Sequence, residues 1–236
     1  MNLTDARILI TGGSSGIGKA TAQLLAAAGA KILITGRNEP SLIAACQGTD
    51  MHYTVADIGT KEGVETTFAA LQAKLGGIDV LVNNAGIGEF DRVEDLTWEA
   101  FERVFNTNVF GLAMLTKHVV PLLKTNGKGA IINIASTASL KGFTMGSIYS
   151  ASKFALRSMT QCWQDELRQF NIRVMQVNPS EVTTAFANPE RTEKPETEKK
   201  LRAAEIAHTI KSILEMDDRG FVPEVTVWAT NPFPAK

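Results

Sequence analysis

The fold is decided close to the start of the chain, where residues 7–18 read RILITGGSSGIG. Ile8, Leu9 and Ile10 form a short apolar run typical of a buried strand, and a glycine-rich stretch follows it directly. Helical spacing then begins, because apolar residues recur at positions 17, 20, 24 and 28 before Gly29 ends the pattern. A strand that passes through glycines into a helix predicts a turn whose backbone approaches an anionic phosphate closely.

Strand and helix patterns alternate along the rest of the chain. The apolar runs at residues 32–34, 80–82 and 131–132 are continuous, which is typical of strands covered on both faces in a parallel sheet. Seven strands are predicted, at Arg7–Thr11, Lys31–Thr35, His52–Ala56, Asp79–Asn83, Ala130–Ala135, Arg173–Asn178 and Val222–Ala229. Residues 1–236 are therefore expected to form a single α/β domain, a doubly wound parallel sheet of about seven strands in three layers.

The composition is that of an ordinary globular protein. The 236 residues are 44% hydrophobic and 21% charged, and the formal net charge is −1. This balance gives no reason to expect nucleic acid or an anionic membrane as a partner. No apolar run approaches the ~20 residues that a membrane span needs, and the N-terminus lacks a signal-peptide pattern. A soluble, cytoplasmic protein is expected.

The cysteines and histidines indicate no metal site. Cys46 and Cys162 are far apart and form no CxxC pair, so two free, buried thiols in a reducing compartment are expected. His52, His118 and His208 are scattered along the chain without metal-ligand spacing. No catalytic metal is predicted.

A nucleoside triphosphatase loop is one alternative for the glycine-rich stretch. Residues 13–19 match the first seven positions of GxxxxGK[ST], but the eighth is Ala20, which has no hydroxyl to bind Mg²⁺. Thr21 comes one residue later, and on a helix this rotates it by about 100°. The stretch therefore favours a dinucleotide over a nucleoside triphosphate.

The end of the second strand indicates which dinucleotide binds. An acidic residue there would hydrogen-bond the ribose 2′-hydroxyl and repel a 2′-phosphate. Here Arg37 and Asn38 follow the strand, and the Arg37 guanidinium can hold a phosphate in bidentate geometry. Glu39 is the one nearby feature that argues for the other cofactor. The sequence predicts NADP(H) in preference to NAD(H).

Further motifs follow in a fixed order. They are Asp57-Ile58 after the third strand, Asn83-Asn84-Ala85-Gly86 after the fourth, Asn108 in a helical stretch, Ser136 after the fifth strand, and Tyr149 and Lys153 at YxxxK spacing. Together with TGxxxGIG at residues 11–18, this combination resembles the short-chain dehydrogenase/reductase family, and the match runs along most of the chain. The resemblance implies a Rossmann-type fold and an oxidoreductase that transfers a hydride between NADP(H) and a carbonyl or secondary alcohol.

The same resemblance implies the catalytic residues Asn108, Ser136, Tyr149 and Lys153. Tyr149 would be the general acid and base, Ser136 would hold the substrate oxygen, Lys153 would bond the nicotinamide ribose, and Asn108 would hold a water on a proton path. Tyr149 and Lys153 are four residues apart and share a helix face. An ammonium about 4 Å from a phenol contributes about 4 kcal/mol, enough to bring a tyrosine pKa of ~10 near neutrality. Lys153 is therefore predicted to lower the pKa of Tyr149.

The residues that the resemblance assigns to the cofactor come from the turns after the predicted strands. They are Gly12, Ser14, Ser15, Gly16, Ile17, Gly18, Arg37, Asn38, Asp57, Ile58, Asn84, Ala85, Gly86, Tyr149, Lys153, Pro179, Val182 and Thr184. Ser180 departs from the pattern, because the family usually has glycine there and serine adopts a positive φ only at a cost. Residues 219–228 also depart from the TGxxxxVDGG ending of many members, which argues against a ketoacyl thioester substrate and a family-typical tetramer.

The substrate cleft is predicted to be largely apolar. The resemblance implies, from family position, a lining of Ala138, Leu140, Phe143, Met145 and Phe186. These residues favour a hydrophobic or modestly polar carbonyl compound, although Lys141 would suit an anionic group. Residues 185–202 are rich in Pro, Glu, Lys and Thr, so residues 185–205 are either a solvated loop that leads into a helix or a lid over the cleft.

Two predictions concern partners and a rival function. The resemblance implies a homodimer or homotetramer that assembles through the helices around residues 99–124 and 147–170. Candidates for the core or the interface are Phe154, Met159, Trp163, Leu167 and Phe170. The alternative function is a catalytically silent NADP(H)-binding sensor or scaffold on the same fold. The intact Ser136, Tyr149 and Lys153 argue against it, since a binder has no chemical need for them.

Overall fold

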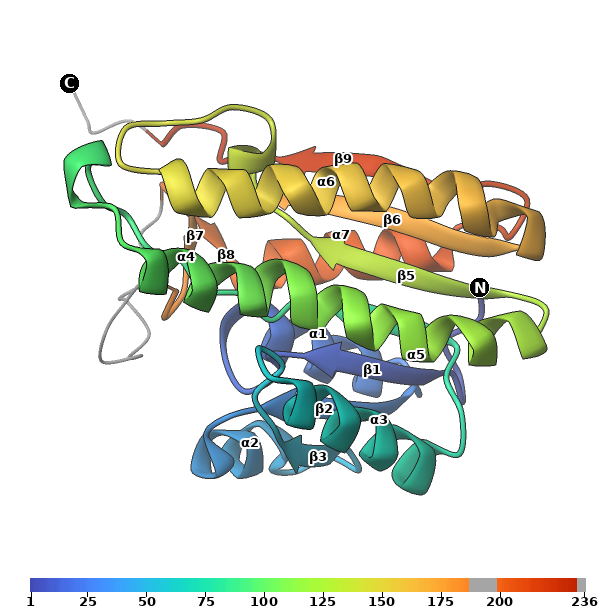
Figure 1. The fold of residues 1–236 in the computed structure, drawn as a ribbon. Helices are drawn as coiled ribbons and strands as arrows, with labels where there is room; N and C mark the ends of the chain where they lie inside the picture. The colour runs from blue at the N-terminus through green and yellow to red at the C-terminus, as the bar shows by residue number, and fades with distance from the viewer. Residues whose placement is uncertain (187–198, 233–236) are drawn as a thin grey trace.

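Within residues 1–186 and 199–232, the part of the chain that the computed structural model describes, seven parallel strands form a central sheet (Figure 1). In spatial order they are β3 (His52–Val55), β2 (Lys31–Gly36), β1 (Arg7–Thr11), β4 (Val80–Asn83), β5 (Gly129–Ile134), β6 (Ile172–Pro179) and β9 (Glu224–Val227). On one side of β1 the sheet continues through β2 to β3, and on the other side it continues through β4, β5 and β6 to β9. The predicted doubly wound parallel sheet is therefore confirmed.

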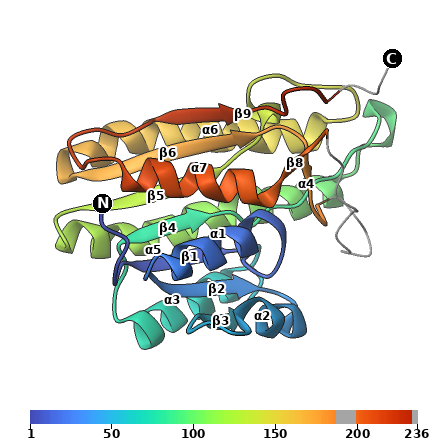
Figure 2. The same cartoon turned by 180° about the vertical axis from the view of Figure 1, so that it is seen from behind.

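Helices cover both faces of this sheet and complete the three predicted layers. One face carries α1 (Gly16–Ala27), α2 (Glu39–Cys46) and α7 (Ala203–Glu215), which lie in front in Figure 2. The other face carries α3 (Lys61–Leu75), α4 (Trp98–Phe105), α5 (Leu112–Thr125) and α6 (Ser147–Leu167), which lie in front in Figure 1.

The apolar runs of the sequence supply two separate cores. Ile8 and Ile10 of β1 are fully buried in one cluster with Ile206 of α7. Leu9, between them, is fully buried in a second cluster with Leu115 of α5. Successive strand residues point to opposite faces, so a strand that is covered on both sides needs an apolar side chain at every position.

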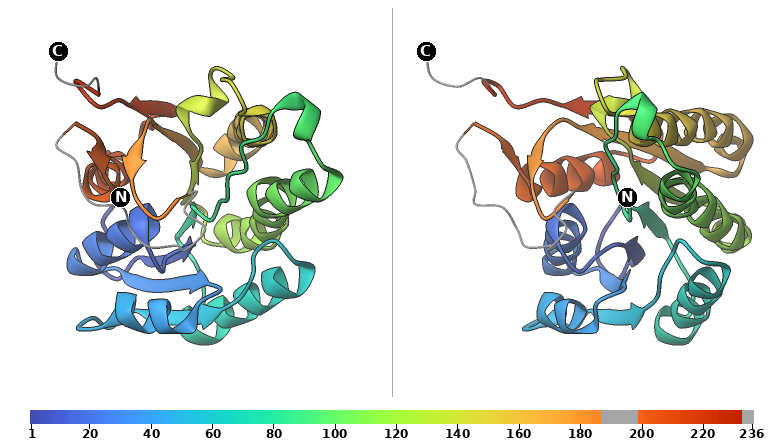
Figure 3. Two further views of the ribbon diagram at one scale, coloured as in Figure 1. Left: turned by 90° about the vertical axis from the view of Figure 1, so that its left-hand side faces the viewer. Right: turned by 60° about the vertical axis from the view of Figure 1, so that its left-hand side comes forward.

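All seven strands end at the same edge of the sheet, on the left in Figure 1. Figure 3 turns this edge toward the viewer. The loops that follow β1, β2, β4 and β5 converge here, next to the short parallel pair β7 (Val182–Thr183) and β8 (Leu201–Arg202). In an open α/β sheet this edge, at the reversal of strand order, is where ligands bind.

The long helix predicted around residues 99–124 is continuous but not uniform. Between α4 and α5 the backbone makes a π-helical turn at Asn106–Gly111. A Cβ atom at Gly111 would lie 1.7 Å from the carbonyl oxygen of Ile58, so the helix passes the loop after β3 at a distance that only glycine allows. π-Helical turns are frequent at functional sites, and this one contains Asn108.

Several predictions are corrected or limited by the structure. The last strand covers Glu224–Val227 instead of Val222–Ala229. Cys46 is half-buried but Cys162 is exposed on α6, so the expected burial of both thiols is wrong. Most of the predicted lid, residues 187–198 of 185–205, lies outside the described residues, whereas β7 and β8 pair on either side of it. None of the described helices is both long enough and apolar enough to cross a membrane.

Candidate active site

A cavity of about 690 Å³ lies at the carboxyl edge of the sheet. Its lining joins the glycine-rich turn at one end to the predicted catalytic residues at the other. The predicted site residues that line it are Gly12, Ser14, Ser15, Gly16, Ile17, Arg37, Asn38, Asp57, Ile58, Asn84, Ala85, Gly86, Ser136, Tyr149, Lys153, Pro179, Val182 and Thr184. Gly18 and Asn108 lie outside the lining.

The glycine-rich turn has backbone requirements that only glycine meets. Gly12 and Gly16 have φ angles of 65° and 51°, in the left-handed region. A Cβ atom at Gly18 would lie 2.3 Å from the carbonyl oxygen of Gly12, so the start of α1 packs directly on the turn. The turn thus brings bare backbone and a helix N-terminus to the cavity, and this arrangement fits the pyrophosphate of the predicted dinucleotide.

Asn84 fastens this turn to the end of β4. Its side-chain amide donates hydrogen bonds to the carbonyl oxygens of Thr11, over 2.9 Å, and Gly12, over 3.0 Å. In return the Thr11 hydroxyl oxygen accepts from the backbone N–H groups of Asn84 and Ala85, each over 3.0 Å. The Asn84 side chain therefore shapes the turn, a role that the motif alone does not reveal.

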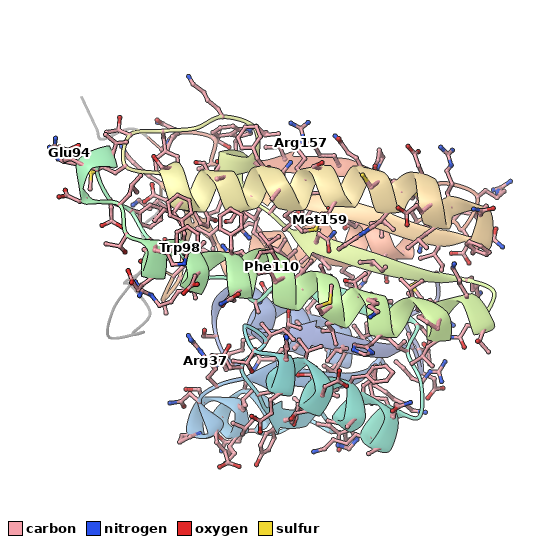
Figure 4. All side chains as sticks on the ribbon, in the orientation of Figure 1. Arg37, Glu94, Trp98, Phe110, Arg157 and Met159 are labelled. Carbon is pink, nitrogen blue, oxygen red and sulfur yellow. The ribbon has the colours of Figure 1, made fainter. Side chains whose placement is uncertain are left out.

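Arg37 lies at the end of the cavity away from Tyr149. It extends beyond the carboxyl end of β2 in Figure 4, and its guanidinium is 3.7 Å from the Asp57 carboxylate. The Arg37 and Asp57 side chains are 43% and 40% exposed, so this ion pair is weak and leaves the guanidinium accessible. Asn38 caps α2 by accepting from the Ser41 N–H over 2.9 Å, and Glu39 accepts from the Tyr53 hydroxyl over 3.3 Å.

The segment after β6 places Thr184 against the glycine-rich turn. Its Cγ2 lies 3.1 Å from the point where a Cβ of Gly16 would be. Ser180, which replaces the usual glycine, is not among the described residues with positive φ, and its N–H donates to the Val227 carbonyl over 2.9 Å. Serine at this position therefore imposes no backbone strain, and both Val182 and Thr184 reach the cavity.

Ser136, Tyr149 and Lys153 meet at the other end of the cavity. The Tyr149 side chain is hydrogen-bonded to Ser136. Ser136 Oγ also accepts from the Ala138 N–H over 3.1 Å, which fixes its orientation at the start of a short turn. Lys153, one helical turn after Tyr149 on α6, donates from Nζ to the Ile134 carbonyl oxygen over 2.8 Å. Tyr149 and Lys153 are only 8% and 4% exposed.

Burial controls the protonation of this pair. Loss of solvent raises the pKa of Tyr149 to about 12, and the hydrogen bond with Ser136 opposes this only in part. Loss of solvent also lowers the pKa of Lys153 to about 8. The Lys153 ammonium faces the Ile134 carbonyl and lies 5.8 Å from the centre of the Tyr149 ring. Lys153 is not among the causes of the Tyr149 shift, so the predicted lowering of the Tyr149 pKa by Lys153 is not seen in this arrangement.

Asn108 stands behind the cavity wall, within the π-helical turn. Its Nδ2 donates to the Ile87 carbonyl over 2.9 Å and to Ser152 Oγ over 3.0 Å, and its Oδ1 accepts from the Ile87 N–H over 2.9 Å. The side chain is fully buried. It joins the loop after β4 to α6, and its neighbour Thr107 reaches the cavity in its place. Its role in a water-mediated proton path stays a prediction.

Part of the lining was not predicted from the sequence. Phe186 lines the cavity as expected, whereas Ala138, Leu140, Phe143 and Met145 do not. The residues that the prediction missed are Thr35, Gly36, Ser41, Ala56, Ile87, Thr107, Ile134, Ala135 and Ala185. All of them except Ser41 lie within two positions of a predicted site residue, so extending each motif by one or two positions would have found those eight.

The comparisons with known proteins agree with this geometry. The family model for short chain dehydrogenases matches residues 6–195. An uncharacterized oxidoreductase from Staphylococcus aureus (strain MRSA252) is 32% identical over 228 residues, covering 95% of this chain and 97% of the relative. L-xylulose reductase from Caenorhabditis elegans is 34% identical over 223 residues, covering 90% of this chain and 88% of the relative.

Among solved structures, an alcohol dehydrogenase from the archaeon Thermococcus sibiricus, complexed with 5-hydroxy-NADP, superposes with a TM-score of 0.89. It is 28% identical, and the match covers 98% of this chain and 99% of that chain. The similarity therefore extends over the whole sheet and all of the cavity-forming loops. The chain belongs to the short chain dehydrogenase family of oxidoreductases.

Proposed function

We propose that the protein is an NADP(H)-dependent carbonyl reductase. The observation that carries this proposal is the placement of Ser136, Tyr149 and Lys153 together at one end of a cavity whose other end holds Arg37 and the glycine-rich turn. Reduction adds one hydride to the carbonyl carbon and one proton to the carbonyl oxygen, and it converts NADPH to NADP⁺. When bound, the nicotinamide supplies the hydride; the chain supplies the proton and holds the substrate.

Tyr149 is the proton donor in this proposal. Its pKa of about 12 keeps the phenol protonated at neutral pH, so it is poised to give a proton and not to take one. Ser136 shares the site and would hydrogen-bond the same carbonyl oxygen, which fixes the oxygen beside the phenol.

Lys153 has a supporting electrostatic role. Its ammonium lies next to the Tyr149 ring in a buried environment, where a positive charge acts strongly. It would stabilise the negative charge that develops on the phenol oxygen as the proton leaves. The family resemblance also assigns it a hydrogen bond to the nicotinamide ribose, and its place in the cavity lining is compatible with that bond.

The preference for NADP(H) rests on Arg37. Its partly exposed guanidinium lines the cavity at the end of β2, where a ribose 2′-phosphate is expected, and Glu39 lies outside the lining. The Thermococcus sibiricus structure contains an NADP derivative, which supports the same cofactor here.

We also propose that the protein assembles as a homodimer or homotetramer through α4, α5 and α6. Phe110, Met114 and Phe154 are 56%, 46% and 43% exposed on or beside these helices. Figure 4 shows Phe110 close to Met159 where α5 and α6 run side by side. An apolar surface of this kind is more stable when a second copy covers it.

Calorimetric titration with NADPH and NADH, followed by turnover with a panel of aldehydes and ketones that includes L-xylulose, tests the function. Tight NADPH binding, weak NADH binding and NADPH oxidation in the presence of a carbonyl compound support the proposal. Tight NADPH binding without turnover of any carbonyl or alcohol would favour the catalytically silent sensor. Failure to bind either cofactor would overturn both.

A further inference from the structure

Two phenylalanines from different loops contact the Tyr149 ring, and a third phenylalanine contacts one of them. Phe90, in the loop after β4, lies 5.6 Å from the Tyr149 ring centre with the planes inclined by 63°. Phe186, after β7, lies 5.4 Å from it at 53°. Phe143, in the loop before α6, lies 6.0 Å from Phe90. We call Phe90, Phe143 and Phe186 the aromatic wall; its members are brought together only by the fold.

Two glycines provide space for the aromatic wall. A Cβ atom at Gly88 would lie 2.8 Å from Cζ of Phe90 and 2.9 Å from Cζ of Phe186, so both ring tips converge above this residue. A Cβ atom at Gly146 would lie 2.7–2.9 Å from three ring atoms of Phe143. Any side chain at either glycine would displace a ring. The aromatic wall is therefore supported by specific backbone positions on two sides.

Among the described residues that line the cavity, Lys153 is the one charged residue at the end near Tyr149. Among the described lining residues the charged ones are Arg37, Asp57 and Lys153. Arg37 and Asp57 pair with each other at the end away from Tyr149, and Lys153 is bonded to the Ile134 carbonyl. A substrate carboxylate or phosphate would find no free cation beside Phe186 within the described lining, and the hydroxyls of a sugar would face aromatic rings that cannot satisfy them.

We propose, resting on the proposed carbonyl reductase function, that the substrate is an uncharged aryl carbonyl compound. Its oxygen lies at Tyr149 and Ser136, and its ring lies against Phe186, which lines the cavity, and reaches toward Phe90, which lies beyond the lining and contacts the Tyr149 ring. Aromatic rings favour the inclined, edge-to-face contacts that these side chains already make with Tyr149. Phe90 and Phe186 thereby become specificity-determining residues, and Phe90 is one that its sequence context did not mark.

A matched pair of ketones tests the proposal. Acetophenone and cyclohexyl methyl ketone share a carbon skeleton and differ in the aromaticity of the ring. The ratio of their kcat/KM values is measured for the wild type, Phe90→Leu and Phe186→Leu, since leucine keeps an apolar side chain but removes the ring. From the usual worth of an aromatic pair, the ratio should fall roughly 2- to 12-fold in each variant. Comparing ratios cancels the different intrinsic reactivity of the two ketones.

Phe170→Leu is the matched control. Phe170 is 37% exposed just beyond the C-terminal end of α6, and Lys124 Nζ lies 4.0 Å from the centre of its ring. The substitution Phe170→Leu should leave the ratio of the two kcat/KM values unchanged. An unaltered Kd for NADPH in each variant shows that the site is folded. A ratio that stays at the wild-type value in both Phe90→Leu and Phe186→Leu, with turnover retained, overturns the aromatic specificity while the reductase function stands.

A wild-type protein that reduces other carbonyl compounds but not acetophenone overturns the aromatic specificity while the reductase function stands. A protein that reduces no carbonyl compound contradicts the reductase function, and a binding measurement then decides the aromatic specificity separately. Both ketones are titrated calorimetrically into the protein saturated with NADP⁺. Acetophenone should bind more tightly than cyclohexyl methyl ketone, and the difference should shrink in Phe186→Leu. Equal affinities, or a difference that Phe186→Leu leaves intact, overturn the proposal.

Discussion

Lys153 Nζ and the carbonyl oxygen of Ile134 lie 2.8 Å apart, and this hydrogen bond joins α6 to the end of β5 beneath the Tyr149 ring. The amine is almost completely buried, at 4% exposure, and no carboxylate compensates for its lost solvation among the causes of its shifted pKa. A charged ammonium in such a place destabilises the folded protein. The buried position of the Lys153 amine therefore does not stabilise the fold, and a functional role explains it better.

Lys153→Met is predicted to raise the free energy of unfolding at pH 7. The lowering of the Lys153 pKa from 10.5 to about 8 corresponds to a penalty on the order of 3 kcal/mol. The penalty is complete below pH 8 and disappears as the pH rises to 10.5, because the unfolded chain binds more protons in that window. Urea unfolding should show wild-type stability rising toward the variant between pH 8 and 10.

Lys153 and Tyr149 change the free energy of unfolding over different pH ranges, so their contributions can be measured separately. Burial raises the pKa of Tyr149 from 10 to about 12, so its stabilising contribution is lost only above pH 10. Lys141→Met, at an exposed loop position, should change neither the stability nor its pH dependence. Parallel pH profiles for the wild type and Lys153→Met would show that Lys153 is not destabilising.

Tyr149→Phe is predicted to lower kcat for carbonyl reduction by about 10²- to 10⁴-fold, the usual contribution of a positioned proton donor. The Kd for NADPH should change little, because the phenyl ring still fills the same buried space. Steady-state kinetics and calorimetry measure the two quantities.

The chain contains two tyrosines, so Tyr53→Phe is a natural control. Tyr53 lies in β3, and its hydroxyl contacts Glu39. Turnover should remain at the wild-type level in this variant. Substantial turnover in Tyr149→Phe would mean that another group donates the proton.

Arg37→Asp is predicted to weaken NADPH binding by about 10- to 100-fold, which is the worth of a charge-assisted hydrogen bond to phosphate. NADH, which lacks the 2′-phosphate, should bind at least as well as before, because an acid there suits the ribose hydroxyls. Arg219→Asp, just before β9 and outside the cavity lining, should alter neither affinity. An unchanged ratio of the two Kd values in Arg37→Asp would remove Arg37 from cofactor selection.

Gly111→Ala is predicted to destabilise the protein by roughly 3 kcal/mol, in the upper range for overpacking. Alanine favours a helix over glycine by about 1 kcal/mol, but its Cβ would lie 1.7 Å from the Ile58 carbonyl oxygen. Gly142→Ala, with nothing within 4 Å of the added Cβ, should unfold at nearly the wild-type urea concentration. Equal midpoints for the two variants would mean that the helix can move away from Ile58 at little cost.

Sequence patterns predicted the strands, the layers and most of the cavity because these depend on local rules. A buried strand needs a continuous apolar run, as at Ile8–Ile10, and the turn after β1 needs glycines where φ is positive or the backbone approaches closely. Parallel strands place their carboxyl ends together, so motifs after successive strands must meet. The cavity accordingly contains all but two of the predicted catalytic and cofactor-binding residues, Gly18 and Asn108.

Tertiary structure alone decided the electrostatics of the site and the surroundings of Tyr149. The spacing of Tyr149 and Lys153 predicted an ammonium aimed at the phenol, but the ammonium bonds to the Ile134 carbonyl. Burial raises the pKa of Tyr149, against the effect of Ser136, and burial lowers the pKa of Lys153. Phe90 and Phe186 reach the Tyr149 ring from loops that are distant in sequence. The local sequence pattern determines where strands, turns and helices form. The solvation and the long-range packing of a side chain depend on all the elements around it, and those elements come together only once the chain has folded.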